Sequence, residues 1–303
     1  MVTSKFELTI EQDPTYLSAT MPVFSKLSHS TVFPEEVLER ILKNFNYEHK
    51  EDRRILKICS LVAQPFYRIV YPIIFKTIRV KGVRKSPVPF AKMIKALEQG
   101  VIIGEVVEKV ELYGVEEELI NCRELYLALS LCSAHSILAL TPKARILKLY
   151  GIRLIPCPHS HNHPPISESA HCPRANLDII LDGVVLDAFD PNDAQPIDWL
   201  TSLKPSSLNT TCVFSDKFLS THDSQLQIPH VYARFIEEQW LSMLRSLRGI
   251  QELQLWDVSS EHQSYVKDII RVNAATLQTL VIGADLGYTG EAGQQTDSIS
   301  QLV

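Results

Sequence analysis

Two short stretches decide the fold, Val107–Val115 (VEKVELYGV) and Lys143–Ile152 (KARILKLYGI). In both, apolar and polar residues alternate, and a Leu-Tyr-Gly sequence closes the run. Alternation with a period of two is typical of a strand that is buried on one face. The two Leu-Tyr-Gly sequences lie 37 residues apart, which indicates that one structural unit is repeated.

The same apolar pattern recurs further along the chain, in ANLDIILDGV (175–184), GIQELQLWDV (249–258), TLQTLVIGAD (276–285) and a fainter LNTTCVF (208–214). Its last apolar position falls at intervals of 27 to 42 residues, at Leu112, Leu149, Leu181, Val213, Leu255 and Ile282. Such intervals are typical of leucine-rich and related solenoids. The alternative is an ordinary α/β domain, whose apolar strands are also separated by helices.

The segments between these runs show the period of amphipathic helices, at 116–140, 193–203, 231–247 and 261–277. Strands that alternate with helices in one direction form a parallel sheet. The sequence therefore predicts an α/β fold, an irregular leucine-rich-repeat-like β/α solenoid with a parallel sheet over residues 106–287.

A different pattern precedes the solenoid. The run FPEEVLERILKNF (33–45) places Val37, Leu38, Ile41 and Leu42 on one face of a helix. After a charged break, NYEHKEDRR, the apolar run 55–80 reads ILKICSLVAQPFYRIVYPIIFKTIRV, and we expect Pro65 and Pro72 to divide it into short helices. A unit of about 45 residues is near the lower limit for a self-sufficient core, so part of this apolar surface must face something else.

These residues resemble an F-box of the fungal type. The opening Phe33-Pro34-Glu35-Glu36, the run Leu56–Val62 and the close Ile73–Ile78 match the family pattern in order, while Ala63 and Phe66 stand where the family usually has Cys and Trp. The resemblance implies a small helical F-box at 31–80 in a non-catalytic substrate receptor of an SCF-type cullin-RING ubiquitin ligase. It also implies a Skp-family adaptor as partner, with a cullin bound through it, and adaptor contacts by Pro34, Val37, Leu38, Ile41, Leu42, Leu61, Val62 and Phe66.

The period of the strands also predicts a binding surface. Side chains between and just after the core leucines point away from the helices, because side chains of a strand alternate between its two faces. We expect these residues to contact a protein substrate: Glu111, Tyr113, Lys148, Tyr150, Asp182 and Trp256, with Ile180 and Gln254 between them. Exposed Tyr and Trp are typical anchors of protein interfaces, so Tyr113, Tyr150 and Trp256 are the expected anchors.

Composition narrows the possible partners and the compartment. A formal net charge of -5, with Lys and Arg scattered along 303 residues, argues against nucleic acid as a partner. The chain has no signal-peptide pattern and no run near the ~20 apolar residues of a membrane span. We therefore expect an intracellular protein of the cytoplasm or nucleus that binds no membrane. Six cysteines without paired spacing favour reduced thiols, with Cys59, Cys122 and Cys132 as core residues.

A metal site is the main rival to a purely binding role. The stretch CPHSHNHPPISESAHC (157–172) contains four histidines and two cysteines, but it has no Cys-x-x-Cys or His-Glu-x-x-His spacing. Its prolines favour an exposed insertion at 157–173, so we expect no metal and no cofactor. Elsewhere the chain lacks the sequence signatures of a phosphate loop, a nucleophile elbow or an acid/base pair, so we expect no catalytic residues.

The remaining segments complete the expected organisation: a mobile N-terminal tail at 1–30, a connecting helical segment at 81–105 and a C-terminal tail at 288–303. Two function classes stay open. One is the substrate receptor; the other is an autonomous α/β protein, either an interaction scaffold or a zinc-binding protein that uses the His-rich stretch.

Overall fold

The computed structural model describes residues 34–46, 49–62, 64–82, 88–99, 101–114, 126–157, 176–186, 199–200, 202–211, 227–235 and 238–283. Both expected tails and nearly all of the His-rich stretch lie outside these ranges. Within them the chain is a mixed α/β protein, as the sequence predicts.

Three helices come first: α1 (Glu35–Leu42), α2 (Lys50–Val62) and α3 (Gln64–Phe75), with α1 and α2 both packed against α3. The charged residues 51–54, expected to form a break, belong to the first turns of α2, whose positive dipole end suits Glu51 and Asp52. Pro65 lies in the first turn of α3, where its missing N–H costs no hydrogen bond. Pro72 does not divide the run as expected, because it lies in the last turn of α3.

Eight parallel strands of five residues each form the main sheet in the order β1-β2-β4-β6-β8-β9-β10-β11. The strands are β1 (Thr77–Lys81), β2 (Lys109–Tyr113), β4 (Ile146–Tyr150), β6 (Asp178–Asp182), β8 (Ser207–Thr211), β9 (His230–Arg234), β10 (Glu252–Trp256) and β11 (Thr279–Gly283). The sheet therefore begins with β1, a strand of which all but the last residue lies in the expected F-box range 31–80.

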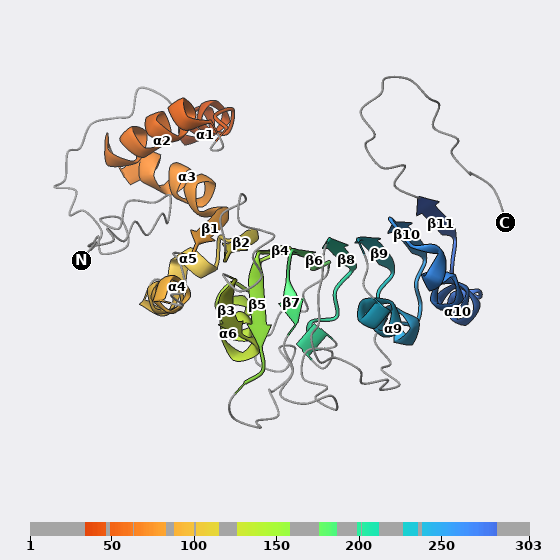
Figure 1. Cartoon of the computed structure of the whole chain (residues 1–303). Helices are drawn as coiled ribbons and strands as arrows, with labels where there is room; N and C mark the ends of the chain where they lie inside the picture. Colours follow the sequence, from red (N-terminus) through yellow and green to blue (C-terminus); the bar gives the residue numbers. More distant parts are fainter. Residues whose placement is uncertain are drawn as a thin grey trace, which may run out of the picture.

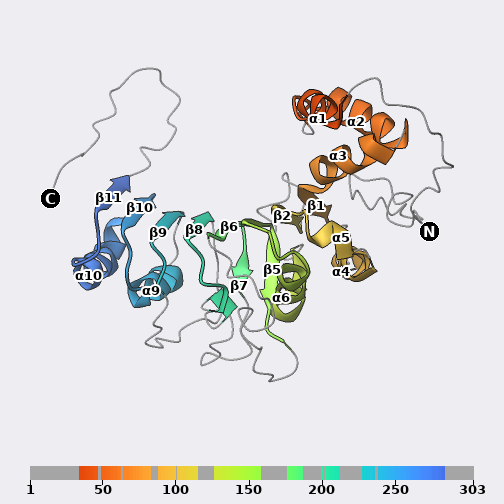
Figure 2. The same ribbon diagram turned by 180° about the vertical axis from the view of Figure 1, so that it is seen from behind.

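A smaller parallel sheet lies beside the first and contains β3 (Leu127–Ser130), β5 (Ile152–Ile155) and β7 (Val185–Leu186). The linking helices are α4 (Val88–Gln99), α5 (Val101–Gly104), α6 (Leu131–Leu140), α9 (Glu238–Ser246) and α10 (Gln263–Asn273), the last preceded by the short 3-10 helix η4 (Ser260–His262). In Figure 1 the main strands run in a row from β1 to β11, with α6, α9 and α10 following below. Figure 2, the view from behind, shows the same arrangement, with α1–α3 beyond the β1 end of the row.

The core follows directly from strand alternation. In every strand of the main sheet from β1 to β10, the second and fourth residues are buried, and the helices contribute apolar side chains to the same cluster. Leu42, Leu56 and Val70 of the first three helices belong to this cluster too. One continuous core therefore runs from α1 to α10.

Three features of the sheet differ from the sequence prediction. Val213 was placed in the repeat frame, but the fourth residue of β8 is Thr210, whose hydroxyl accepts a hydrogen bond from Trp240 Nε1 at 3.0 Å. The sequence predicts one helix over 231–247, but the first residues of this segment belong to β9, which divides the longest interval between repeats. Likewise Leu127–Ser130, inside the helix expected at 116–140, forms β3.

The repeated glycines end the main strands. The N–H of Gly114 donates to Tyr150 O (2.8 Å), and the N–H of Gly151 donates to Asp182 O (2.9 Å), so each glycine extends the ladder by one bond. Gly151 has a φ of 57°, a conformation that a residue with a Cβ adopts only at a cost. This turn leads β4 directly into β5.

Candidate binding surfaces

Large apolar side chains are exposed on the first two helices. Six side chains with 40–65% of their surface exposed make up what we call the helical apolar surface: Val37 and Ile41 of α1, and Ile55, Ile58, Leu61 and Val62 of α2. Most exposed large apolar residues of the described chain lie here, the others being Val88, Phe235, Trp256 and Ile282. Apolar side chains gathered in this way mark an interaction site more often than a free surface.

The structure divides the eight expected adaptor contacts into two groups. Val37, Ile41, Leu61 and Val62 are exposed, as is Pro34, whose carbonyl accepts the N–H groups of the first turn of α1. Leu38 and Leu42 are buried within the helical unit, and Phe66 is half-buried against the core. Helical periodicity predicts that the apolar residues of α1 share one face. In the structure Leu38 and Leu42 are buried, and only Val37 and Ile41 are exposed.

Sequence reasoning missed Ile55 and Ile58. Both lie on α2, three residues apart and in line with Leu61 and Val62, so they extend the exposed row along the helix. The signal was present in the sequence as an apolar residue every third or fourth position from 55 to 62. It was ambiguous, because Leu56 in the same run is fully buried.

The second surface is the side of the main sheet opposite the buried row, which we call the open face. The register places Glu111, Lys148, Ile180 and Gln254 in one row across the strands, and Tyr113, Tyr150, Asp182 and Trp256 in the next row. All the residues expected to face away from the buried row therefore do so. Their exposure differs: Glu111 and Tyr150 are buried, and Trp256 is 43% exposed.

Glu111 is a buried carboxylate that two cations satisfy. Its two oxygens lie 2.5 Å from Arg79 Nε and 2.6 Å from Lys109 Nζ, one cation from β1 and one from β2 itself. Burial alone would raise the pKa of Glu111, but the hydrogen bonds and charges of Lys109 and Arg79 outweigh it and lower the pKa below its ordinary value. Glu111 is thus a structural anion of the open face and not an exposed contact.

Tyr113 and Tyr150 form an aromatic pair beside it. Their ring centroids lie 5.5 Å apart, and Lys148 Nζ lies 5.8 Å from each of them. Burial and the neighbouring Glu111 charge raise the pKa of Tyr113 to about 12, and its hydroxyl donates to Glu111 at 3.4 Å.

The far end of the open face is aromatic as well. The indole of Trp256 lies on its neighbour Gly283 in β11, where a Cβ would come within 2.1 Å of the ring. Arg234 pairs with Asp257 at 2.9 Å and lies over the ring of Phe235, which is itself exposed. Phe235 has a φ of 51°, a backbone conformation that is energetically unfavourable for a residue with a bulky side chain.

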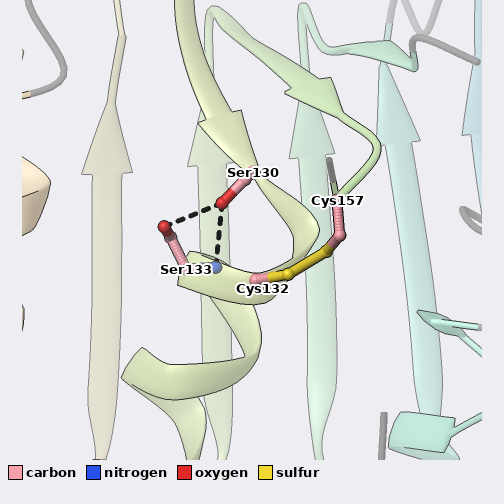
Figure 3. The surroundings of a disulfide bond; sticks show 4 residues. All are labelled: Ser130, Cys132, Ser133 and Cys157. Carbon is pink, nitrogen blue, oxygen red and sulfur yellow. Dashed lines mark hydrogen bonds between the residues drawn. A yellow bond between two sulfur atoms is a disulfide. The ribbon is translucent and has the colours of Figure 1, made fainter. Parts of the chain in front are cut away.

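A disulfide contradicts the expectation that all cysteines are reduced. Cys132, in the first turn of α6, is bonded to Cys157, 25 residues later (Figure 3). The reason is the pairing of β3 with β5: Ser130 lies opposite Ile155, and each cysteine follows two residues after its strand ends. Ser130 caps α6 at the same point by accepting the N–H of Ser133 at 3.1 Å.

The disulfide also concerns the His-rich stretch, since Cys157 is the first residue of that stretch. In the described ranges the free cysteine is Cys59. A disulfide sulfur is not a thiolate, so Cys157 in this state is no metal ligand. Residues 158–173 lie outside the described ranges. Among the residues that are described, no group of three or more His, Cys, Asp or Glu side chains is arranged to hold a metal ion.

Comparisons with known proteins find no matching family model and no curated protein of significant sequence similarity. Within the described ranges, no helix is both long and apolar enough to cross a membrane.

Proposed function

We propose that this chain is a non-catalytic substrate receptor of an SCF-type ubiquitin ligase, which binds a Skp-family adaptor through α1 and α2 and a protein substrate through the open face. The observation that carries this proposal is the helical apolar surface. Its six side chains belong to the segment whose sequence resembles an F-box, and they are the part of that segment that the protein's own core leaves exposed.

The energetics favour a permanent partner for this surface. Fully burying an exposed large aliphatic side chain contributes roughly 1.5–3 kcal/mol, and these six side chains still have 40–65% of their surface exposed, so a partner that covers them gains several kcal/mol. Laying the apolar faces of helices into a groove of a partner is a recurrent mode of recognition. An adaptor site at one end of the molecule also leaves the long open face available for a substrate.

The test is co-purification of the full chain with a Skp-family adaptor. Ile41→Lys and Leu61→Lys replace exposed side chains near the C-terminal ends of α1 and α2, where a positive charge agrees with the helix dipole and helix stability is retained. Each should abolish adaptor binding, because the contact would have to desolvate an unpaired ammonium group. Leu38 is unsuitable for this test, because it is buried in the protein's own core.

Val88→Lys is the control, since Val88 is about as exposed as Ile41 but is the first residue of α4, outside the helical apolar surface. It should leave adaptor binding unchanged. Adaptor binding that survives in folded Ile41→Lys and Leu61→Lys variants would contradict the proposal. A wild-type chain that does not bind the adaptor would favour the alternative of an autonomous interaction scaffold. If that chain also bound stoichiometric zinc, it would favour the alternative of a zinc-binding protein.

A further inference from the structure

Charge is distributed unevenly along the open face. Strands β1, β2 and β4 carry four cations, Arg79, Lys81, Lys109 and Lys148, against one anion, Glu111. All five lie at the first, third or fifth position of their strands and therefore on the open face. This end of the face has a net charge of +3 after its own acid is counted.

The charge of the open face changes from positive to negative at the next strand, β6. Asp178 and Asp182 are the charged residues of β6, and both lie on the open face beside β4. An anionic ligand would therefore be attracted over β1, β2 and β4 and repelled from β6. Three strands at a spacing of about 4.8 Å span roughly 10 Å, which corresponds to three or four residues of an extended chain.

The chemistry of the cations favours separate carboxylates over a single phosphate. A phosphate is held best by converging donors, above all by an arginine fork, but Arg79 already donates Nε to Glu111. The lysines are point charges on three different strands, and Lys148 Nζ lies 5.8 Å from the ring of Tyr113, whose hydroxyl already donates to Glu111.

An aromatic contact point lies further along the same face. Trp256 on β10 is four strands from Lys148 on β4, a distance of about 19 Å, or roughly six residues of an extended chain. An exposed indole supported by a neighbouring backbone, here Gly283, is a suitable partner for a large apolar side chain.

We infer that the open face binds an extended, acidic segment of a protein partner, with three or four Asp or Glu residues over β1, β2 and β4 and a large apolar residue about six positions away on Trp256. The inference rests on the proposed function in one respect, because it assigns the chemistry of the substrate that the receptor would capture. Charge complementarity selects this occupant.

The experiment is selection of a phage-displayed library of random dodecapeptides on the immobilised full chain. The enriched peptides should contain a cluster of Asp and Glu with a large apolar residue about six positions away. The affinity of one such synthetic peptide, measured by fluorescence anisotropy, should fall about tenfold or more in Lys148→Glu, because an attraction becomes a repulsion, and also in Trp256→Ala.

Lys267→Glu on α10 is the matched control, since it makes the same change in net charge at an exposed position away from the sheet. It should leave the peptide affinity unchanged. Absence of acidic enrichment, or equal affinity in Lys148→Glu and wild type, would overturn the inference. Adaptor co-purification is measured with the wild type in parallel: a wild-type chain that binds the peptide but not the adaptor contradicts the proposed function alone.

Discussion

Glu111 illustrates how a single residue can satisfy the strand pattern and still have an unexpected role. Its place between two core positions predicts a side chain on the open face, and the side chain does lie there. Arg79 and Lys109 nevertheless hold its carboxylate so closely that Glu111 is 2% exposed. Periodicity determines the direction of a side chain, whereas its exposure depends on neighbours from other strands.

The first prediction concerns the pH dependence of Glu111→Gln. The pKa of Glu111 in the folded protein lies below the ordinary value of 4.5, so the ionised carboxylate stabilises the fold fully above pH 4.5 and loses this effect as the pH falls through the folded-state pKa. Glu111→Gln should lower the free energy of unfolding by about 1–3 kcal/mol at pH 7, and by progressively less below pH 4.5. Urea unfolding over this pH range measures the difference.

Glu39→Gln serves as the control, because Glu39 forms an exposed ion pair with Lys43 on α1. Exposed ion pairs contribute little to stability, so Glu39→Gln should change the free energy of unfolding by about 0.5 kcal/mol or less, both at pH 7 and below pH 4.5. A Glu111→Gln variant that matches Glu39→Gln at pH 7 would show that the buried pair adds no stability.

At the scale of elements, the strands β2, β4, β6, β10 and β11 could be predicted from their large aliphatic residues, whereas the core position of β8 was misplaced and β9 was missed. Leu149 and Leu181 identify β4 and β6, but Thr210 and Ala233 occupy the same frame in β8 and β9 and carry too weak an apolar signal. Thr210 is acceptable in the core because Trp240, which is distant in sequence, satisfies its hydroxyl. Strand β3 was hidden for another reason, since the run LALSLC fits a buried helix as well as a strand.

The pairing of strands also explains why the disulfide could not be predicted from the sequence. Neither cysteine has a partner at a recognisable spacing, and the bond becomes apparent only once β3 is known to pair with β5. It fastens the start of α6 to the end of β5 and closes a loop that includes α6 and β4. In the chain-entropy model, closing a loop of this length stabilises the fold by roughly 3 kcal/mol.

The second prediction tests this bond with the double variant Cys132→Ala/Cys157→Ala. Under oxidising conditions its free energy of unfolding should be lower than that of the wild type by up to about 3 kcal/mol. Dithiothreitol should remove most of this difference by weakening the wild type. Cys59→Ala, which removes the free cysteine of the described ranges, should leave the effect of dithiothreitol unchanged. A wild type whose stability does not depend on dithiothreitol would show that the bond is absent in solution.

At the scale of the whole molecule, stability depends on how many neighbours each strand has. Each inner strand of the main sheet pairs with a strand on either side, and helices cover one side of the row. Strand β11 ends the row: Leu280 is half-buried and Ile282 is 45% exposed, whereas the corresponding residues of β10, Leu253 and Leu255, are fully buried. The continuous core thus thins toward its C-terminal end.

The last prediction follows from this gradient. In a linear array, units at an end lack one interface and open with a smaller free energy than units in the middle. Backbone amides of β11 should therefore exchange with deuterium well before those of β4 and β6, and amides of β10 should be intermediate. Hydrogen-exchange mass spectrometry of the full chain measures the order. Uniform protection from β4 to β11 would mean that the sheet unfolds as one unit, and protection of β11 that appears only with an acidic peptide would indicate that the ligand closes this end of the row over Trp256.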